Sequence, residues 1–209
     1  QGGHHRCCGR DHRGNPADLP FSVTLPLEPG LNIVTLVAEE TAVLPGKVLL
    51  KRLLPEHFVF LRPRDIVSGD FYWVDQKNER IVVCAADCTG HGVPGAFMSI
   101  VGYNQLNYAL SVKKSRSSDD ILNNLNKGVI ETLSSESTHE SKVMDGMDLA
   151  LCVFDKELKK VQFSGANNPL LLIRDGELTQ YNADKFPIGA YEGKIPQVFT
   201  KNELDLKKG

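Results

Sequence analysis

The spacing of apolar residues changes from strand-like to helix-like and back along this chain. The run Ile81–Ala86 is continuously apolar, which is typical of a strand buried on both faces. Pro94 can begin a helix because its missing N–H would be unpaired there, and this helix is expected to end near Val112. A second helix is expected from Ser118, because its hydroxyl can cap free N–H groups and two aspartates follow at the positive end of the dipole.

Shorter apolar segments on either side of these helices predict further strands. They are His57–Leu61, Asp70–Asp75, Leu149–Phe154, Val161–Ser164, Leu170–Ile173 and Leu178–Tyr181, with one or two more pieces within 198–206. Gln76–Glu79 and Asn167–Pro169 are expected to be turns, and Asp175-Gly176 is a strong hairpin signal. This order of strands, two helices and strands predicts an α+β fold with layered, largely antiparallel sheets.

The first 50 residues differ from the rest of the chain. Residues 1–18 are polar and rich in Gly and His, which is typical of a disordered tail. Within 19–50, Phe21–Leu25 and Leu31–Val37 alternate apolar and polar residues around a Pro- and Gly-rich turn, which predicts a β-hairpin. This segment resembles the last hairpin of bacterial immunoglobulin-like domains. Because two strands alone are marginal in water, we expect it either to dock on the remainder or to be an isolated remnant.

Composition and charge exclude several classes of protein. The 209 residues carry 24 Lys and Arg against 26 Asp and Glu, a net charge of −2, whereas a general nucleic-acid binder would show a basic excess. A hydrophobic content of 41% argues against wholesale disorder. No apolar run reaches the roughly 18–20 residues that span a bilayer, and residues 1–13 lack the apolar core of a secretory signal.

The five cysteines are too few and too scattered for a disulfide scaffold. Cys84, Cys88 and Cys152 lie in or beside apolar runs, so we expect buried free thiols, which suit a reducing compartment such as the cytoplasm. Cys7 and Cys8 lie among histidines in HHRCCGRDH, a set that could bind zinc or nickel. We interpret this set as a solvated tail, because structural zinc sites use spaced ligand pairs on a folded frame.

Asp70 and Asp87 are the most informative polar residues. Each stands at the abrupt edge of an apolar strand, in IVSGD and in AADCTGHGVPG. A buried carboxylate needs a partner, and Mg²⁺ or Mn²⁺ can supply one because hard cations prefer oxygen ligands. The nearby glycines allow tight turns that can aim carbonyls at a cation or N–H groups at an anion. A Gly-rich turn with two capping aspartates explains the same pattern.

Five motifs in series carry a resemblance to a known family. They are RDIVSGDFYW, AADCTGHGVPGAFMSIVG, DGMDLALCVFD, GANNPLLLIRDGEL and DKFPIG. Together they closely resemble bacterial PPM-type serine/threonine phosphatases of the SpoIIE/RsbU group, over residues 54–209. The resemblance implies a PP2C-like β-sandwich of two antiparallel sheets flanked by α-helices. It also implies a metal-dependent phosphoprotein phosphatase, in which two Mn²⁺ or Mg²⁺ ions hold a water that attacks phosphorus with no phosphoenzyme.

The resemblance also implies roles for individual residues. Asp70 matches the family's first metal-binding acid, and Asp87 matches the acid that bridges both metals. Cys88 takes the place of the residue whose backbone carbonyl contacts one metal, so its thiol need not participate. His91 can donate a proton to the leaving oxygen, or it can hydrogen-bond the loop and hold its shape, and the second role is slightly favoured.

Other polar and aromatic residues near these motifs have plainer interpretations. Asp145 and Asp148 flank a Gly-Met turn and can support the metal ligands without touching the ion, although a solvated turn accounts better for Asp145. The aromatic run Phe71–Trp73 is expected in the core. Ser99 lies near His91 in the sequence, but no nucleophile-elbow pattern surrounds it, which disfavours a Ser/His/Asp hydrolase.

The chain departs from the family pattern after Leu204. An SDG-type motif and a later acidic motif, which normally supply metal ligands, do not follow, so the sandwich is expected to be C-terminally incomplete and the second metal site to lack most of its ligands. Open sheet edges invite association, for example as a homodimer. The family's targets imply a phosphorylated regulator of the anti-sigma antagonist type as partner. The alternative is a catalytically inactive phosphatase-like fragment that binds a partner or has no function.

Overall fold

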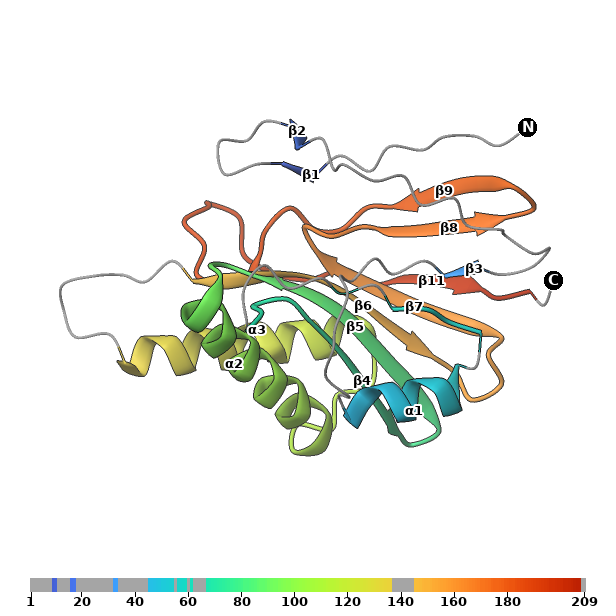
Figure 1. The fold of residues 1–209 in the computed structure, drawn as a ribbon, viewed down its shortest axis with the longest axis horizontal. Helices are drawn as coiled ribbons and strands as arrows, with labels where there is room; N and C mark the ends of the chain where they lie inside the picture. The colour runs from blue at the N-terminus through green and yellow to red at the C-terminus, as the bar shows by residue number, and fades with distance from the viewer. Residues whose placement is uncertain are drawn as a thin grey trace.

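An antiparallel sheet of six strands runs through the computed structural model of this chain (Figure 1). The structure describes residues 9–10, 16–17, 32–33, 45–54, 56–59, 61, 67–136 and 145–207. The helices are α1 (Pro45–Leu53), α2 (Gly92–Ser111) and α3 (Ser118–Glu136). The strands are β1 (Gly9–Arg10), β2 (Pro16–Ala17), β3 (Asn32–Ile33), β4 (Phe71–Lys77), β5 (Arg80–Cys88), β6 (Gly146–Phe154), β7 (Lys160–Ala166), β8 (Leu170–Arg174), β9 (Glu177–Tyr181), β10 (Ile188–Gly189) and β11 (Asn202–Asp205).

The strand order confirms the predicted α+β fold with antiparallel sheets. The large sheet has the order β11-β7-β6-β5-β4, and β10 pairs with the beginning of β6. A second sheet has the order β3-β8-β9, and β1 pairs with β2. These strand pairings are antiparallel. The continuously apolar strand β5 lies between β4 and β6, where both of its faces are covered.

The large sheet separates two hydrophobic cores, because successive residues of a strand face opposite sides. In β4, Phe71 and Trp73 face the core beneath α2 and α3, whereas Tyr72 and Val74 face the other core. That second core also takes in β8, so the small sheet packs on the face of the large sheet opposite α2 and α3 (Figure 1). The expected placement of residues 71–73 in the core is confirmed.

The hairpin between β4 and β5 turns later than the sequence predicted. β4 continues through Gln76 to Lys77, which pairs with Arg80. The turn consists of Asn78 and Glu79, whose φ angles of 48° and 64° are left-handed. Two left-handed turn residues match the twist of the flanking strands, so the polar residues before them can join the ladder.

The prediction of a strand at His57–Leu61 is wrong for the described residues of that segment, which pair with no strand. His57 Nδ1 instead hydrogen-bonds the carbonyl of Leu54 just after α1. Leu61 is buried in the second core. Leu61 and, in part, Val59 therefore pack on this core without extending the sheet.

Residues 45–50, at the end of the expected hairpin segment, begin helix α1. Pro45 suits a first helical position, and Leu49, Leu50 and Leu53 recur at helical spacing and pack on the second core. Of the expected hairpin, Asn32–Ile33 form β3 and pair with β8. The other arm, Phe21–Leu25, and the tail with Cys7 and Cys8 lie outside the described residues.

The second long helix begins at Ser118, as predicted. Its buried hydroxyl accepts a hydrogen bond from Ser164 Oγ at 2.8 Å, which ties α3 to β7. Cys84, Cys88 and Cys152 are buried free thiols, also as predicted. None of the helices in the described ranges combines the length and apolarity needed to cross a bilayer.

Candidate metal site at the ends of three strands

Strand pairing brings the two sequence-predicted acids together. Asp70 directly precedes β4, and Asp87 is the second-last residue of β5. Phe71 pairs with Ala86, so the next residues along the two antiparallel strands are Asp70 and Asp87. Their carboxyl groups are close enough to share a hydrogen bond when one of them holds a proton. Two acids that are distant in the sequence therefore form one carboxylate pair.

The environment of this pair disfavours a second negative charge. Partial burial is the largest cause that raises the pKa of Asp87, and the charge of Asp70 and their shared hydrogen bond add to it, so that the pKa reaches about 6. A cation between the two acids would compensate the repulsion. The carboxyl pair thus has the oxygen chemistry that a hard divalent cation prefers.

A third acid, Asp148, lies beside this pair on the neighbouring strand. β6 pairs with β5 so that Asp148 is opposite Asp87. The Nδ2 of Asn167 donates a hydrogen bond to Asp148 Oδ1 at 2.8 Å. Burial, and to a smaller extent the charge of Asp87, raise the pKa of Asp148, whereas the Asn167 hydrogen bond lowers it. Three carboxyl groups therefore follow one another across the ends of β4, β5 and β6.

The sequence motifs indicated Asp148 as a residue that supports the metal ligands, but they did not indicate Asn167 as its hydrogen-bonding partner. Asn167 was predicted as a turn residue, and the turn is confirmed by its left-handed φ of 57°. Its amide, however, reaches Asp148 across 19 positions of sequence. No local sequence signal indicates this contact, because it depends on the pairing of β6 with β7, which places the residue after β7 beside the start of β6.

Three glycines bring the loops of the site into close contact. A Cβ on Gly95 would lie 2.7 Å from the Gly90 carbonyl oxygen and 3.1 Å from the Gly69 Cα. Gly90 itself has a left-handed φ of 83°. The segment that carries Asp70 therefore packs directly on the loop after β5 and on the first turn of α2, which a side chain would prevent.

Thr89 links this loop to the beginning of β6. Its hydroxyl accepts a hydrogen bond from the Gly146 N–H at 2.9 Å and lies 3.3 Å from Asp145 Oδ1. Its own N–H donates to the Gly146 carbonyl at 2.9 Å. Asp145 is half-buried and lies within hydrogen-bonding distance of Thr89, and its interpretation as a solvated turn residue stays a prediction.

Cys88 contributes no thiolate to the site. Its side chain lies in the core beneath α2, and burial, with the nearby charges of Asp70 and Asp87, raises its pKa to about 12. Without a bound metal, such a thiol stays protonated near neutral pH and is a poor nucleophile. A role for its backbone carbonyl stays a prediction.

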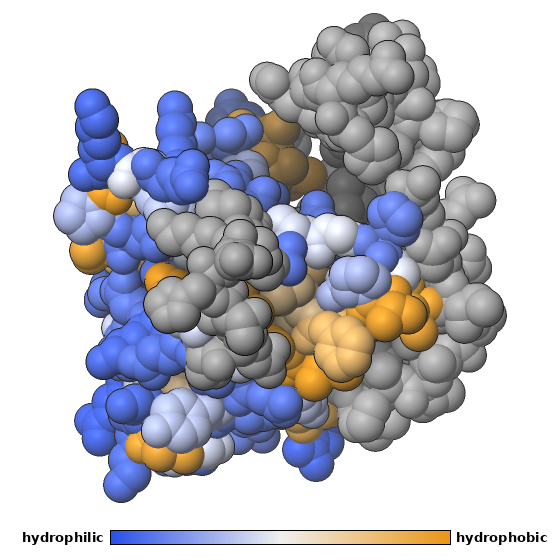
Figure 2. Space-filling view, turned by 90° about the vertical axis from the view of Figure 1, so that its left-hand side faces the viewer, coloured by the Kyte–Doolittle hydropathy of each residue, from blue (hydrophilic) through white to orange (hydrophobic). Residues whose placement is uncertain are grey.

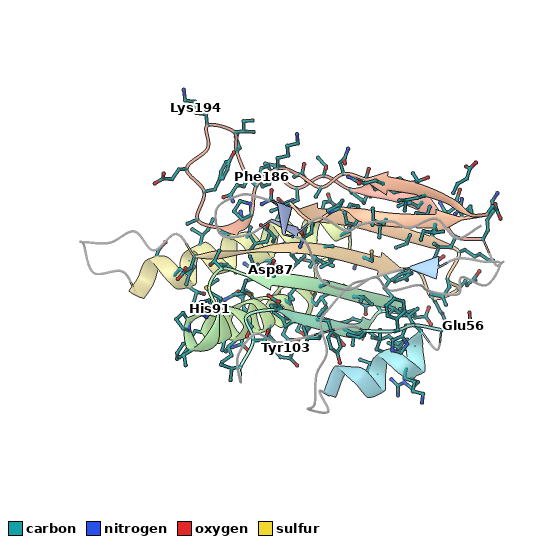
Figure 3. All side chains as sticks on the ribbon, turned by 45° about the horizontal axis from the view of Figure 1, so that its top comes forward. Glu56, Asp87, His91, Tyr103, Phe186 and Lys194 are labelled. Atoms are coloured by element: carbon teal, nitrogen blue, oxygen red, sulfur yellow. The ribbon has the colours of Figure 1, made fainter. Side chains whose placement is uncertain are left out.

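His91 lies at the N-terminus of α2, at the same end of the sheet as Asp87 (Figure 3). Its backbone is extended, with φ −135° and ψ 168°, and its imidazole does not cap the helix. The side chain is exposed. The imidazole therefore does not accept a hydrogen bond from the free N–H groups at the start of α2.

The donor set of the described residues is limited. No three His, Cys, Asp or Glu side chains in the described ranges converge so as to hold one metal ion. The paired oxygens of Asp70 and Asp87 match a hard cation that keeps water ligands, which is how Mg²⁺ usually binds. The residues present therefore fit Mg²⁺ or Mn²⁺ through two carboxylates.

An exposed apolar surface begins beside the site, on the face of α2 that points away from the sheet. Val93, Phe97 and Ile100 recur at helical spacing and are 62%, 65% and 55% exposed. Figure 2 looks onto the end of the molecule where α2 begins and shows hydrophobic surface gathered there. Contiguous exposed apolar side chains of this kind are typical of interaction sites.

Solved structures of phosphatase domains share this fold. The SiaA PP2C domain of Pseudomonas aeruginosa has a TM-score of 0.65 at 28% identity, over 78% of this chain and 61% of that one. The PP2C domain of SpoIIE from Bacillus subtilis, with a regulatory fragment, gives 0.51 at 20% identity, over 68% and 38%. RsbX in complex with magnesium gives 0.50 at 14% identity, over 70% and 64%. The chain thus spans about three fifths of the SiaA domain structure, and its fold is PP2C-like.

The family assignment follows from the sequence match. The family model for Stage II sporulation protein E (SpoIIE) matches residues 77–209, which is more than half of the chain. The chain therefore belongs to the SpoIIE family, as its motifs predicted. No protein with a curated description matched it.

The carboxylate pair should destabilise the metal-free protein as pH rises. The pKa of Asp87 is raised from 3.8 to about 6, so the folded state holds a proton that the unfolded state has lost between these values. Stability is therefore lost as pH rises through this window. In EDTA, we expect Asp87→Asn to be more stable than wild type at pH 7.5 by about 1 kcal/mol, a value reduced for solvent screening, and no more stable near pH 4.

Chemical denaturation at both pH values measures this difference. Asp175→Asn is the matched control, because Asp175 is an exposed turn residue with φ 52°, which Asn tolerates. A stability gap for Asp87→Asn that is equal at both pH values would show that the repulsion is absent.

Close packing of the loops predicts that replacing one helical glycine by alanine destabilises the protein, which is the opposite of the usual effect. Gly→Ala within a helix normally stabilises by about 0.5–1 kcal/mol. Gly95→Ala is expected to destabilise by about 1–3 kcal/mol, because its Cβ would meet backbone atoms that cannot move aside. Urea unfolding measures the change. Gly128→Ala in α3 is the control, since the three atoms nearest to its Cβ would all belong to the flexible Gln105 side chain, and equal behaviour of the two variants would contradict the proposed packing.

Proposed function

We propose that this chain is a metal-dependent protein phosphatase that hydrolyses phosphoserine or phosphothreonine on a bacterial signalling regulator. The observation that carries the proposal is the Asp70–Asp87 carboxyl pair in a chain of the SpoIIE family. The likeness to the SiaA PP2C domain supports the reaction type. The structure of RsbX with magnesium supports a divalent cation as cofactor. We also propose that the phosphatase domain covers residues 54–209 and that the protein is cytoplasmic.

Asp70, Asp87 and the backbone carbonyl of Cys88 would hold Mn²⁺ or Mg²⁺. When bound, such an ion supplies a water nucleophile near neutral pH and offsets the charge of the phosphoryl oxygens. The chain itself supplies the positioning: β4–β5 pairing fixes the acids, and the Gly69–Gly90–Gly95 contact fixes the loop that carries Asp70. The pair Asp70–Asp87 also keeps the site negative, so a cation is needed before a phosphate group can enter.

His91 has two candidate roles in this reaction. Its exposed imidazole at the start of α2 can donate a proton to the leaving serine oxygen, or it can maintain the shape of the Gly-rich loop. Because the exposed imidazole lies at the same end of the sheet as Asp87 (Figure 3), proton donation is the role that we propose.

Metal-dependent turnover is the direct test of the proposal. We expect wild type to hydrolyse p-nitrophenyl phosphate with Mn²⁺ and to stop in EDTA. Asp70→Asn and Asp87→Asn are expected to lose at least about 100-fold in kcat/KM, since each removes a charged oxygen ligand. Asp175→Asn, at an exposed hairpin turn, is the control and should retain full activity. Undiminished turnover by Asp87→Asn would contradict the metal-phosphatase proposal.

A second candidate function is a binding module without turnover. The exposed apolar residues Val93, Phe97 and Ile100 beside the site favour it. Such a module would retain a phosphorylated partner protein on a column with or without Asp87→Asn, and would show no hydrolysis in the Mn²⁺ assay. The same assay therefore separates the two functions.

Leaving-group dependence separates the two roles of His91. A serine alkoxide leaves poorly without a proton, whereas p-nitrophenolate leaves readily. If His91 is the proton donor, His91→Gln should reduce kcat for a phosphoserine peptide by about 100-fold and kcat for p-nitrophenyl phosphate only slightly. Kinetics with the two substrates at one pH measure this ratio. Equal losses of kcat on both substrates would indicate that His91 maintains the shape of the loop instead.

A further inference from the structure

Backbone hydrogen bonds on both sides of Asn167 hold its turn in place. The Asn167 N–H donates to the Asp184 carbonyl at 2.8 Å, and the Asp184 N–H donates to the Gly165 carbonyl at 3.0 Å. The Asn168 N–H donates to the Ala166 carbonyl at 2.6 Å. These bonds hold Asn167 at a φ of 57°, a conformation that Asn tolerates better than most residues. The side-chain amide therefore starts from a well-defined backbone position.

The amide of Asn167 orients Asp148 without neutralising it. Nδ2 donates to Asp148 Oδ1 at 2.8 Å, which occupies one oxygen and restricts rotation of the carboxyl group. A Lys or Arg in this place would cancel the negative charge, whereas an amide leaves it intact. In the part of the chain that the structure describes, the ion pairs involve other acids, namely Glu79, Glu131, Glu157 and Glu203.

The oriented carboxyl group lies next to the metal-binding pair. Asp148 is opposite Asp87 on paired strands, and the two charges interact. Opposed residues of neighbouring antiparallel strands have Cβ atoms about 4.5–5.5 Å apart. At such a distance a negative charge that is not itself a ligand still strengthens the attraction of a divalent cation to its neighbour.

We propose that Asn167 is a positioning residue, which holds Asp148 beside Asp87 and thereby raises the affinity of the Asp70–Asp87 pair for a divalent cation. The inference rests on the proposed function, because it concerns the same cation. It differs from a plain turn role, which would require only the backbone conformation of Asn167.

The substitution Asn167→Gly separates the two roles. Glycine adopts a φ of 57° without steric cost, so the turn is kept and only the amide is lost. We expect the affinity for Mn²⁺, titrated by calorimetry on the full chain, to fall about tenfold, as is usual when a hydrogen-bonding partner of a metal site is removed. The melting temperature in EDTA should change little. Asn168→Gly, the same replacement in the same turn, is the matched control and should bind Mn²⁺ as wild type does.

A double-mutant cycle tests whether Asn167 acts through Asp148. Asp148→Asn alone should weaken Mn²⁺ binding by a similar factor, and Asn167→Gly should add little in the Asp148→Asn background. Asp148→Asn also keeps the test decisive if Asn167→Gly folds poorly. Wild-type affinity in both single variants, or independent and additive losses, would overturn the inference. Absence of Mn²⁺ binding by the wild-type chain would overturn the proposed function, and this inference with it.

Discussion

Two carboxyl groups, Asp70 and Asp87, are held together against their mutual repulsion by the pairing of β4 with β5. The pairing extends from Phe71 opposite Ala86 to Lys77 opposite Arg80, so its hydrogen bonds and the packing of β4 on both cores fix the acids in place. The strand pairing therefore keeps the backbones of the two acids side by side. The free energy of folding thus sustains an electrostatically unfavourable arrangement, which is how sites that bind cations are commonly prepared.

The loops around the pair are shaped by close backbone contact rather than by side chains. Gly69, Gly90 and Gly95 meet where the segment before β4, the loop after β5 and the first turn of α2 converge. On the opposite side, Thr89 bonds to the beginning of β6, which carries Asp148. Each neighbouring strand is therefore connected to the loop after β5 by its own contact.

The architecture explains why a chain of the SpoIIE family can place a site where the strands of its sheet end. The two cores on either side of the large sheet bury the strand interiors, so polar side chains gather where the strands end. There the start of α2 lies next to Asp87 and His91 (Figure 3), and the exposed residues Val93, Phe97 and Ile100 adjoin them.

Much of this could be predicted from local patterns in the sequence. Helical spacing and the Pro94 and Ser118 signals located α2 and α3, alternation and Asp175-Gly176 located β8 and β9, and serial motifs indicated the family and the acids Asp70 and Asp87. Local signals failed where long-range packing decided the outcome. Leu61 became part of a core without forming a strand, and Leu49 to Leu53 formed a helix against the same core.

The sequence by itself determined the residue types of the site, the approximate positions of the central strands and the glycines that allow tight turns, because these depend on a residue and its near neighbours. Only the tertiary structure decided which acids meet. The opposition of Asp87 and Asp148 depends on the register of β5 and β6, and the bond from Asn167 depends on β7 lying next to β6. Register and strand order arise from contacts across the whole sheet, so no single stretch of sequence contains them.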